Sequence, residues 1–232
     1  MVDRTLPEPD RYAVCPLDGS ILDFYRGVFD AAYVLLHPFI RPVSISSDRF
    51  KEQANLSSNE ICRTCEPVSW SAIQAASDLP SMSAVDIALK TMIRGLKREL
   101  ANETFADKLE EVLRTDDIVE PSEGSFPELT QNAMLSFIQS LGYQWVWVGD
   151  EHCTERKLYW IDDLKPPNAK NELFRSSVFT PDKAILWTVH WDSHYSFFCS
   201  SAENVAKLSR LADLEGFVCT QATEVYWSVR NG

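Results

Sequence analysis

The sequence predicts an α+β protein, in which a helical N-terminal part (1–142) precedes a mainly antiparallel sheet (143–232) with a C-terminal helix packed on it. Up to residue 142, apolar residues recur mainly at intervals of three and four, as on the buried face of a helix. Beyond it, short β-branched and aromatic runs are separated by turn residues, and six of the seven tryptophans lie there. Helices followed by strands are typical of the α+β class.

In the first part, Ser20 with Asp23 resembles a capping box, in which side chains satisfy the free N–H groups at a helix start. The run ILDFYRGVFDAAYVLLH predicts that this helix continues until prolines 38 and 42 end it. Residues 43–68 show no clean period and predict a loop with one short helix. Three further helices are expected, over Ser83–Ala101, Thr104–Arg114 and Glu128–Leu141, the last ended by Gly142.

In the second part, short runs rich in β-branched and aromatic residues predict strands. Five are expected over 144–148, 157–161, 176–180, 217–220 and 224–229, with a helix over 201–214. The stretch AILWTVHWDSHYSFFCS (184–200) adds one strand or two. The acidic, Pro- and Gly-containing segment 115–127 is the best linker candidate.

His190, Asp192 and His194 occupy every second position of this stretch. In a continuous strand the three side chains share one face, whereas with residues 191–194 as a hairpin turn the two histidines face each other across the ladder. Two imidazoles and a carboxylate are ligands typical of catalytic zinc or non-haem iron. The alternative is a plain turn with hydrogen-bonded histidines beside it.

The loop GDEHCTERK (149–157) gathers charges between two aromatic strands. Glu151 and Glu155 are the candidate catalytic groups, as general bases, because a carboxylate can accept a proton there. Partner-binding candidates are Asp150, His152 and Arg156. The alternative is a solvated hairpin loop. A Cys62-x-x-Cys65 pair has the spacing of a zinc or redox site, but without a second pair we interpret it as structural.

The aromatic residues of the second part allow two interpretations. Exposed tryptophan and tyrosine side chains dominate protein interfaces, which makes Trp187, Trp191 and Tyr195 candidate binding residues. Alternatively, most of these aromatic residues fill the core between the sheet and its helices.

The chain is acidic, with a formal net charge of −12 and a pI near 4.8. Such a charge repels phosphate backbones, which excludes nucleic acid, and would steer a basic protein or a cationic ligand toward the chain. The alternative is that the acidity only keeps the protein soluble. A signal peptide and any apolar run of about 20 residues are missing, so we expect a cytoplasmic protein that does not enter the membrane. Common nucleotide-binding and hydrolase motifs are also missing.

The runs WVWVGDEHCTERKLYWIDDL, HWDSHYSFFCSS and LEGFVCTQATEVYW, with YAVCPLDGSILDFYRGVFDAAYVLLHPFIRP, resemble a bacterial family known as domain of unknown function 2711. The resemblance covers nearly the whole chain, which implies a single integrated unit (1–232). It implies no activity. The sequence therefore favours a protein-binding module of immunity or inhibitor type; the alternative is a small metal-dependent enzyme using the His-x-Asp-x-His cluster.

Overall fold

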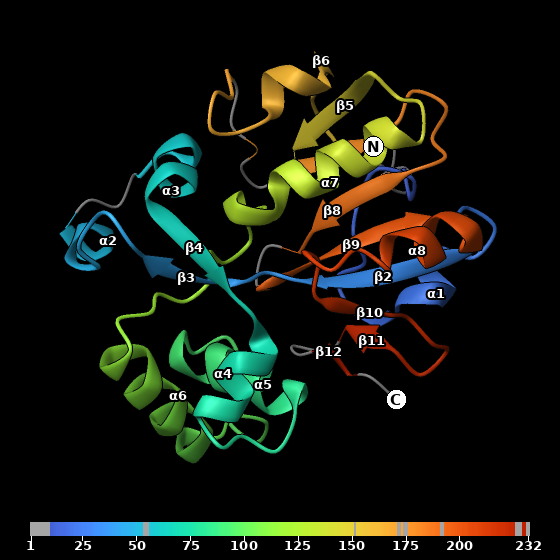
Figure 1. Ribbon diagram of the computed structural model, residues 1–232. Coiled ribbons are helices and arrows are strands. Elements are labelled where there is room, and N and C mark those ends of the chain that lie inside the picture. Colours follow the sequence, from blue (N-terminus) through green and yellow to red (C-terminus); the bar gives the residue numbers. More distant parts are fainter. Residues whose placement is uncertain are drawn as a thin grey trace, which may run out of the picture.

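A seven-stranded sheet, antiparallel throughout its described pairs, forms the centre of the computed structural model (Figure 1), which describes residues 10–52, 56–150, 152–170, 173, 176–190, 193–225 and 229–230. Its strands in spatial order are β10 (Gly216–Val218), β2 (Ala31–Leu36), β9 (Tyr195–Ser200), β8 (Leu186–Val189), β7 (Ser176–Phe179), β5 (Trp145–Asp150) and β6 (Arg156–Trp160).

The helices surround this sheet, which confirms the α+β class. They are α1 (Ile21–Phe24), α2 (Asp48–Glu52), α3 (Ser58–Thr64), α4 (Trp70–Ala76), α5 (Met82–Met92), α6 (Glu103–Thr115), α7 (Glu128–Ser140) and α8 (Ala202–Leu208), with a 3-10 helix η1 (Ile161–Leu164). Two small sheets pair β3 (Phe39–Pro42) with β4 (Cys65–Val68), and β11 (Glu224–Val225) with β1 (Gly19–Ser20) and β12 (Val229–Arg230).

Both faces of the central strands are buried. On one face, Leu186 and Phe197 belong to a core shared with residues of α4, α5 and α6; on the other, Trp187 and Phe198 belong to a core shared with α7 and α8. Figure 1 shows α7 and α8 in front of the sheet and α4 to α6 gathered below it. The aromatic residues of β8 and β9 therefore alternate between two cores, because each face has its own helical cover.

Strand β2 corrects the predicted helix after Ser20. The helix α1 ends at Phe24, Gly27 adopts a positive φ of 76°, and the chain then extends as a strand between β10 and β9. Its segment AAYVLL is buried on both faces. A strand covered on both sides has a continuous apolar run, which also fits a helical period, and so the sequence pattern was ambiguous. The sheet thus takes a central strand from the first part of the chain.

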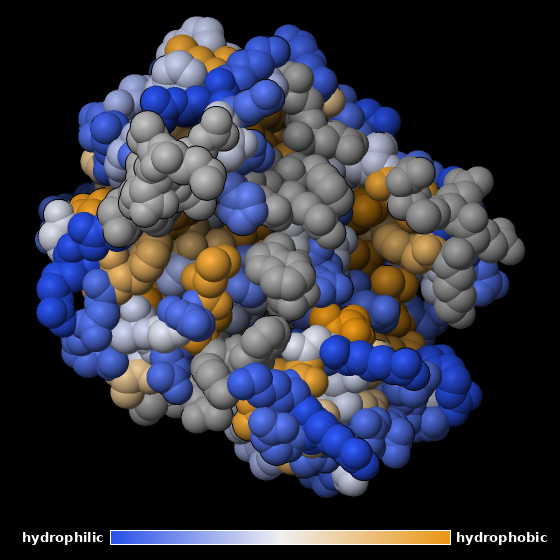
Figure 2. All heavy atoms as spheres, turned by 180° about the vertical axis from the view of Figure 1, so that it is seen from behind, coloured by the Kyte–Doolittle hydropathy of each residue, from blue (hydrophilic) through white to orange (hydrophobic). Residues whose placement is uncertain are grey.

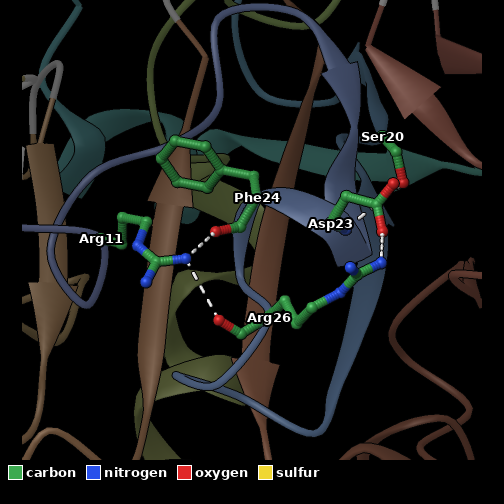
Figure 3. A network of polar contacts seen from close by, with 5 residues as sticks. All are labelled: Arg11, Ser20, Asp23, Phe24 and Arg26. Carbon is green, nitrogen blue, oxygen red and sulfur yellow. Dashed lines mark hydrogen bonds and ion pairs between the residues drawn. The ribbon is translucent and has the colours of Figure 1, made fainter.

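The start of α1 is capped as predicted, since the Asp23 amide donates to the Ser20 hydroxyl at 3.3 Å. Figure 3 shows the other end, where the Arg11 guanidinium donates to the carbonyls of Phe24 at 2.8 Å and Arg26 at 3.1 Å. Arg26 in turn pairs with Asp23. A cation is favourable where helix carbonyls lack amide partners, so Arg11 ties the N-terminal segment to α1.

Other helices begin or end differently from the prediction. Ser81, rather than Ser83, caps α5 by accepting from the Ala84 amide at 3.2 Å, and the helix stops at Met92 because Arg94 turns with a φ of 60°. The last helix, α8, ends at Leu208 and not at residue 214. Helices α6 and α7 agree with the prediction to within one residue at each end.

Candidate functional site

The stretch 184–200 is a hairpin and not a continuous strand. Strand β8 ends at Val189, which pairs with Ser196, and β9 begins at Tyr195. The Ser193 amide donates to the His190 carbonyl at 3.1 Å. The hairpin interpretation of the stretch is thus confirmed by the pairing of the two strands, while Trp191 and Asp192 lie outside the described residues. If the pairing of the two strands is continued by one residue, however, His190 lies opposite Tyr195 and not opposite His194.

His194 instead lies beside His37, which sequence reasoning missed. The pairing of Leu36 with Tyr195 continues one step, and the His37 amide donates to the His194 carbonyl at 3.0 Å. Both side chains are buried. Burial first, and then the neighbouring His194, lower the pKa of His37 to about 3, so its ring is neutral at pH 7. His190 contacts Ser193, with Nδ1 and Oγ 3.3 Å apart.

The predicted metal ligands are only partly described. Asp192 lies outside the described residues, so the His190, Asp192 and His194 set stays a prediction. Among the described residues, no three His, Cys, Asp or Glu side chains are arranged to hold one metal ion. The Cys62 thiol is held protonated, since burial, with Glu128 second, raises its pKa to about 11.

The charged loop between β5 and β6 is organised by Asp150. Its carboxylate accepts from the amides of His152 at 3.1 Å, Thr154 at 2.8 Å and Glu155 at 3.1 Å, and from the Thr154 hydroxyl. Desolvation alone would raise the pKa of Asp150, but these hydrogen bonds, led by Thr154, hold it below its usual value. We interpret Asp150 as a loop-forming residue, because its oxygens are occupied by the loop itself.

The other candidate residues of this loop differ in their surroundings. His152 and Glu155 are exposed, whereas Glu151 lies outside the described residues. Arg156 stands over the Trp147 ring at 5.8 Å and contacts the Tyr12 hydroxyl at 3.2 Å. Arg156 therefore packs the N-terminal segment against the sheet.

Two of the three aromatic binding candidates belong to the core. Trp187 and Tyr195 are fully buried, and Trp191 lies outside the described residues. The Trp187 indole donates to the Ser196 hydroxyl at 3.0 Å, which accounts for its one polar atom. Trp145 on β5 is instead 46% exposed and stacks edge-on against Trp160, with ring centroids 5.1 Å apart.

An acidic groove with a volume of about 410 Å³ is lined by residues of α2, α5 and α6 and by the segment 117–120. Three carboxylates line it, those of Glu110, Asp117 and Glu120, together with one guanidinium, that of Arg114. Its apolar lining consists of Phe50, Met92, Leu113, Ile118 and Val119. Arg114 is bound by Glu111 at 2.6 Å, so its positive charge is balanced by a neighbour. The groove therefore combines an apolar lining with a negative rim.

Helix α6 supplies Glu110 and Arg114 of this lining, whereas Asp117 and Glu120 follow the helix in the chain. Its residues Ala106, Leu109 and Leu113 are buried, while its acidic residues lie on the outer side: Glu103, Asp107, Glu110 and Glu111. Figure 2 shows separate hydrophobic areas bordered by hydrophilic residues on the face seen from behind. The repeating acids opposite the apolar stripe of 104–114 indicate the charged outer side of α6, of which Glu110 lines the groove.

Comparison with known proteins identifies relatives of the whole fold. A family model described as "Protein of unknown function (DUF2711)" matches residues 18–229. The chain is 22% identical to the uncharacterized protein YwbB of Bacillus subtilis (strain 168) over 215 residues, covering 90% of this chain and 95% of that protein. No solved structure matches. None of the described helices has the length and apolar character needed to cross a membrane.

Proposed function

Since the chain belongs to the DUF2711 family, which is described only as proteins of unknown function, we propose a function from the groove: a non-catalytic binding protein of inhibitor or immunity type, which holds a basic segment of a partner protein. The observation that carries this proposal is the combination of three carboxylates with an apolar lining in one groove. A segment with lysine or arginine on one side and apolar residues on the other complements both features.

The charge of the molecule supports the same partner. The net charge of −12 attracts cationic proteins over distances near the Debye length, about 8 Å at physiological salt. Glu110, Asp117 and Glu120 are exposed, so they can meet a partner without unfolding. Exposed charges contribute modest energies singly, so we expect them to set the encounter rate and orientation, with affinity added by Phe50, Met92 and Leu113.

The proposal can be tested with a synthetic amphipathic peptide of lysine and leucine, whose binding is followed by fluorescence anisotropy. The groove variant carries Glu110→Gln, Asp117→Asn and Glu120→Gln. Its matched control changes three exposed carboxylates near β1, β2 and β10 that do not line the groove, with the same change of net charge: Asp18→Asn, Asp30→Asn and Asp213→Asn.

We expect the peptide to bind the unmodified protein with an affinity that falls as salt rises, and the groove variant to bind about tenfold or more weakly than the control. Equal weakening of both variants would assign binding to net charge alone and contradict a role for the groove. Unchanged binding in the groove variant would also contradict it.

A further inference from the structure

A second cavity, of about 320 Å³, lies between the start of α5 and the sheet. Its floor is formed by buried residues from three elements: Leu36 of β2, Trp70 of α4 and Tyr195 of β9. Its mouth is formed by the partly exposed residues Met82, Ser83, Glu215, Gly216 and Phe217. The space is therefore deep, open at one end and mostly apolar, as small-molecule sites are.

Polar groups converge at the inner wall of this cavity. Asp86 is 2% exposed and Tyr195 is fully buried. Lys90 stands behind them, with its Nζ 3.6 Å from Asp86 Oδ2 and 3.4 Å from the Tyr195 hydroxyl. At the mouth, the Glu215 carboxylate accepts from the amides of Trp70 at 2.5 Å and Ser71 at 2.9 Å.

The charged side chains that line the cavity are negative. Asp86 and Glu215 line the cavity and each carries a negative charge, whereas Lys90 supplies one positive charge and does not line it. Burial opposes the charge of Lys90, but Asp86 and then Tyr195 raise its pKa, so the amine stays protonated. A protonated lysine is not a nucleophile, which leaves Lys90 the role of counter-ion to Asp86. The cavity favours a cation over an anion.

We propose that this cavity binds a small primary amine with an apolar body, a function separate from the acidic groove. The ammonium group lies between Asp86 and Glu215, where carboxylate and hydroxyl oxygens can accept its three N–H bonds. The apolar body packs against Trp70, Met82 and Phe217.

Isothermal titration calorimetry tests the proposal with three probes of similar shape: 2-phenylethylamine, 2-phenylethanol and 3-phenylpropionate. We expect the amine to bind one to one, about tenfold or more tightly than the alcohol, and the carboxylate to bind most weakly. The result that overturns the proposal is an amine that does not bind at millimolar concentration, or one that binds no more tightly than the alcohol.

Two variants locate the binding. Ser83→Phe places a ring at the mouth and should abolish binding of the amine, whereas Ser209→Phe, an exposed serine at the end of α8, should leave it unchanged. Glu215→Gln removes the charge and keeps one of the two acceptor oxygens, and should weaken the amine about tenfold but not the alcohol, whose unchanged affinity shows that the cavity is intact. Equal affinity in Ser83→Phe and Ser209→Phe would overturn the assignment. Binding of the lysine and leucine peptide to Ser83→Phe separates this test from that of the groove.

Discussion

Replacement of Lys90 by methionine should destabilise the protein strongly. Lys90 and Asp86 lie one turn apart on α5, with side chains only 3% and 2% exposed. Methionine keeps most of the apolar stem of lysine, so Lys90→Met removes mainly the charge. Asp86 is then left in the core without its cation. A buried carboxylate that loses its counter-ion costs about 3–5 kcal/mol.

The structure offers a control of the same spacing. Lys207 and Glu203 on α8 are also four residues apart and lie closer, at 2.8 Å, but their side chains are 51% and 78% exposed. An exposed pair at this spacing contributes about 0.3–0.5 kcal/mol. Lys207→Met should therefore change the free energy of unfolding several-fold less than Lys90→Met, although its ion pair is shorter. Burial, and not distance, decides the difference.

Urea unfolding at pH 7, followed by tryptophan fluorescence, measures both changes. The double variant Asp86→Asn with Lys90→Met removes both charges, and we expect it to be about 1 kcal/mol or more stable than the sum of its single variants predicts. If Lys90→Met lies within about 0.5 kcal/mol of Lys207→Met, or if the single effects add, the pair is not coupled in a buried environment and the reasoning is refuted.

Three further results are expected. The pKa of His37 is lowered from 6.5 to about 3, so its contribution to stability is present above pH 6.5 and is lost as the pH falls toward 3. The loss reaches up to ~1.4 kcal/mol per pH unit. In urea titrations from pH 7 to 5, a His37→Gln variant should therefore lose stability less steeply than the unmodified protein. Asp150→Ala should lower the unfolding free energy by about 1–2 kcal/mol, whereas a result within error of zero would show that its loop contacts do not matter. Gly216→Ala should cost more than about 2 kcal/mol in thermal unfolding, because a Cβ there would meet the Val34 carbonyl oxygen at 2.0 Å.

The sequence predicted the later strands of the sheet better than strand β2. Short aromatic runs predicted β5, β6 and β7, because a strand in this sheet needs only a few alternating residues between clear turns. It misassigned β2, because AAYVLL is buried on both faces and carries no alternation. Its pairing with β9 and β10, both more than 150 residues later, makes it a strand, and such long-range pairing leaves no local signal.

The site was predicted in part for similar reasons. His190 and His194 do lie at a hairpin, as their spacing allowed. His37, the neighbour of His194, directly follows β2, so its proximity depends on the same unpredicted pairing. The burial of Asp86 beside Lys90 depends on the packing of α5 against the sheet. Sequence spacing reports neighbours within an element, not the contacts made across the core.

Hydrogen–deuterium exchange with and without the lysine and leucine peptide tests the acidic groove most directly. We expect slower exchange in the second half of α6 and in residues 117–120, which line the groove, with no change in the β5–β6 hairpin. Protection of that hairpin, with α6 unchanged, would contradict the account and move the binding surface to Trp145 and Trp160.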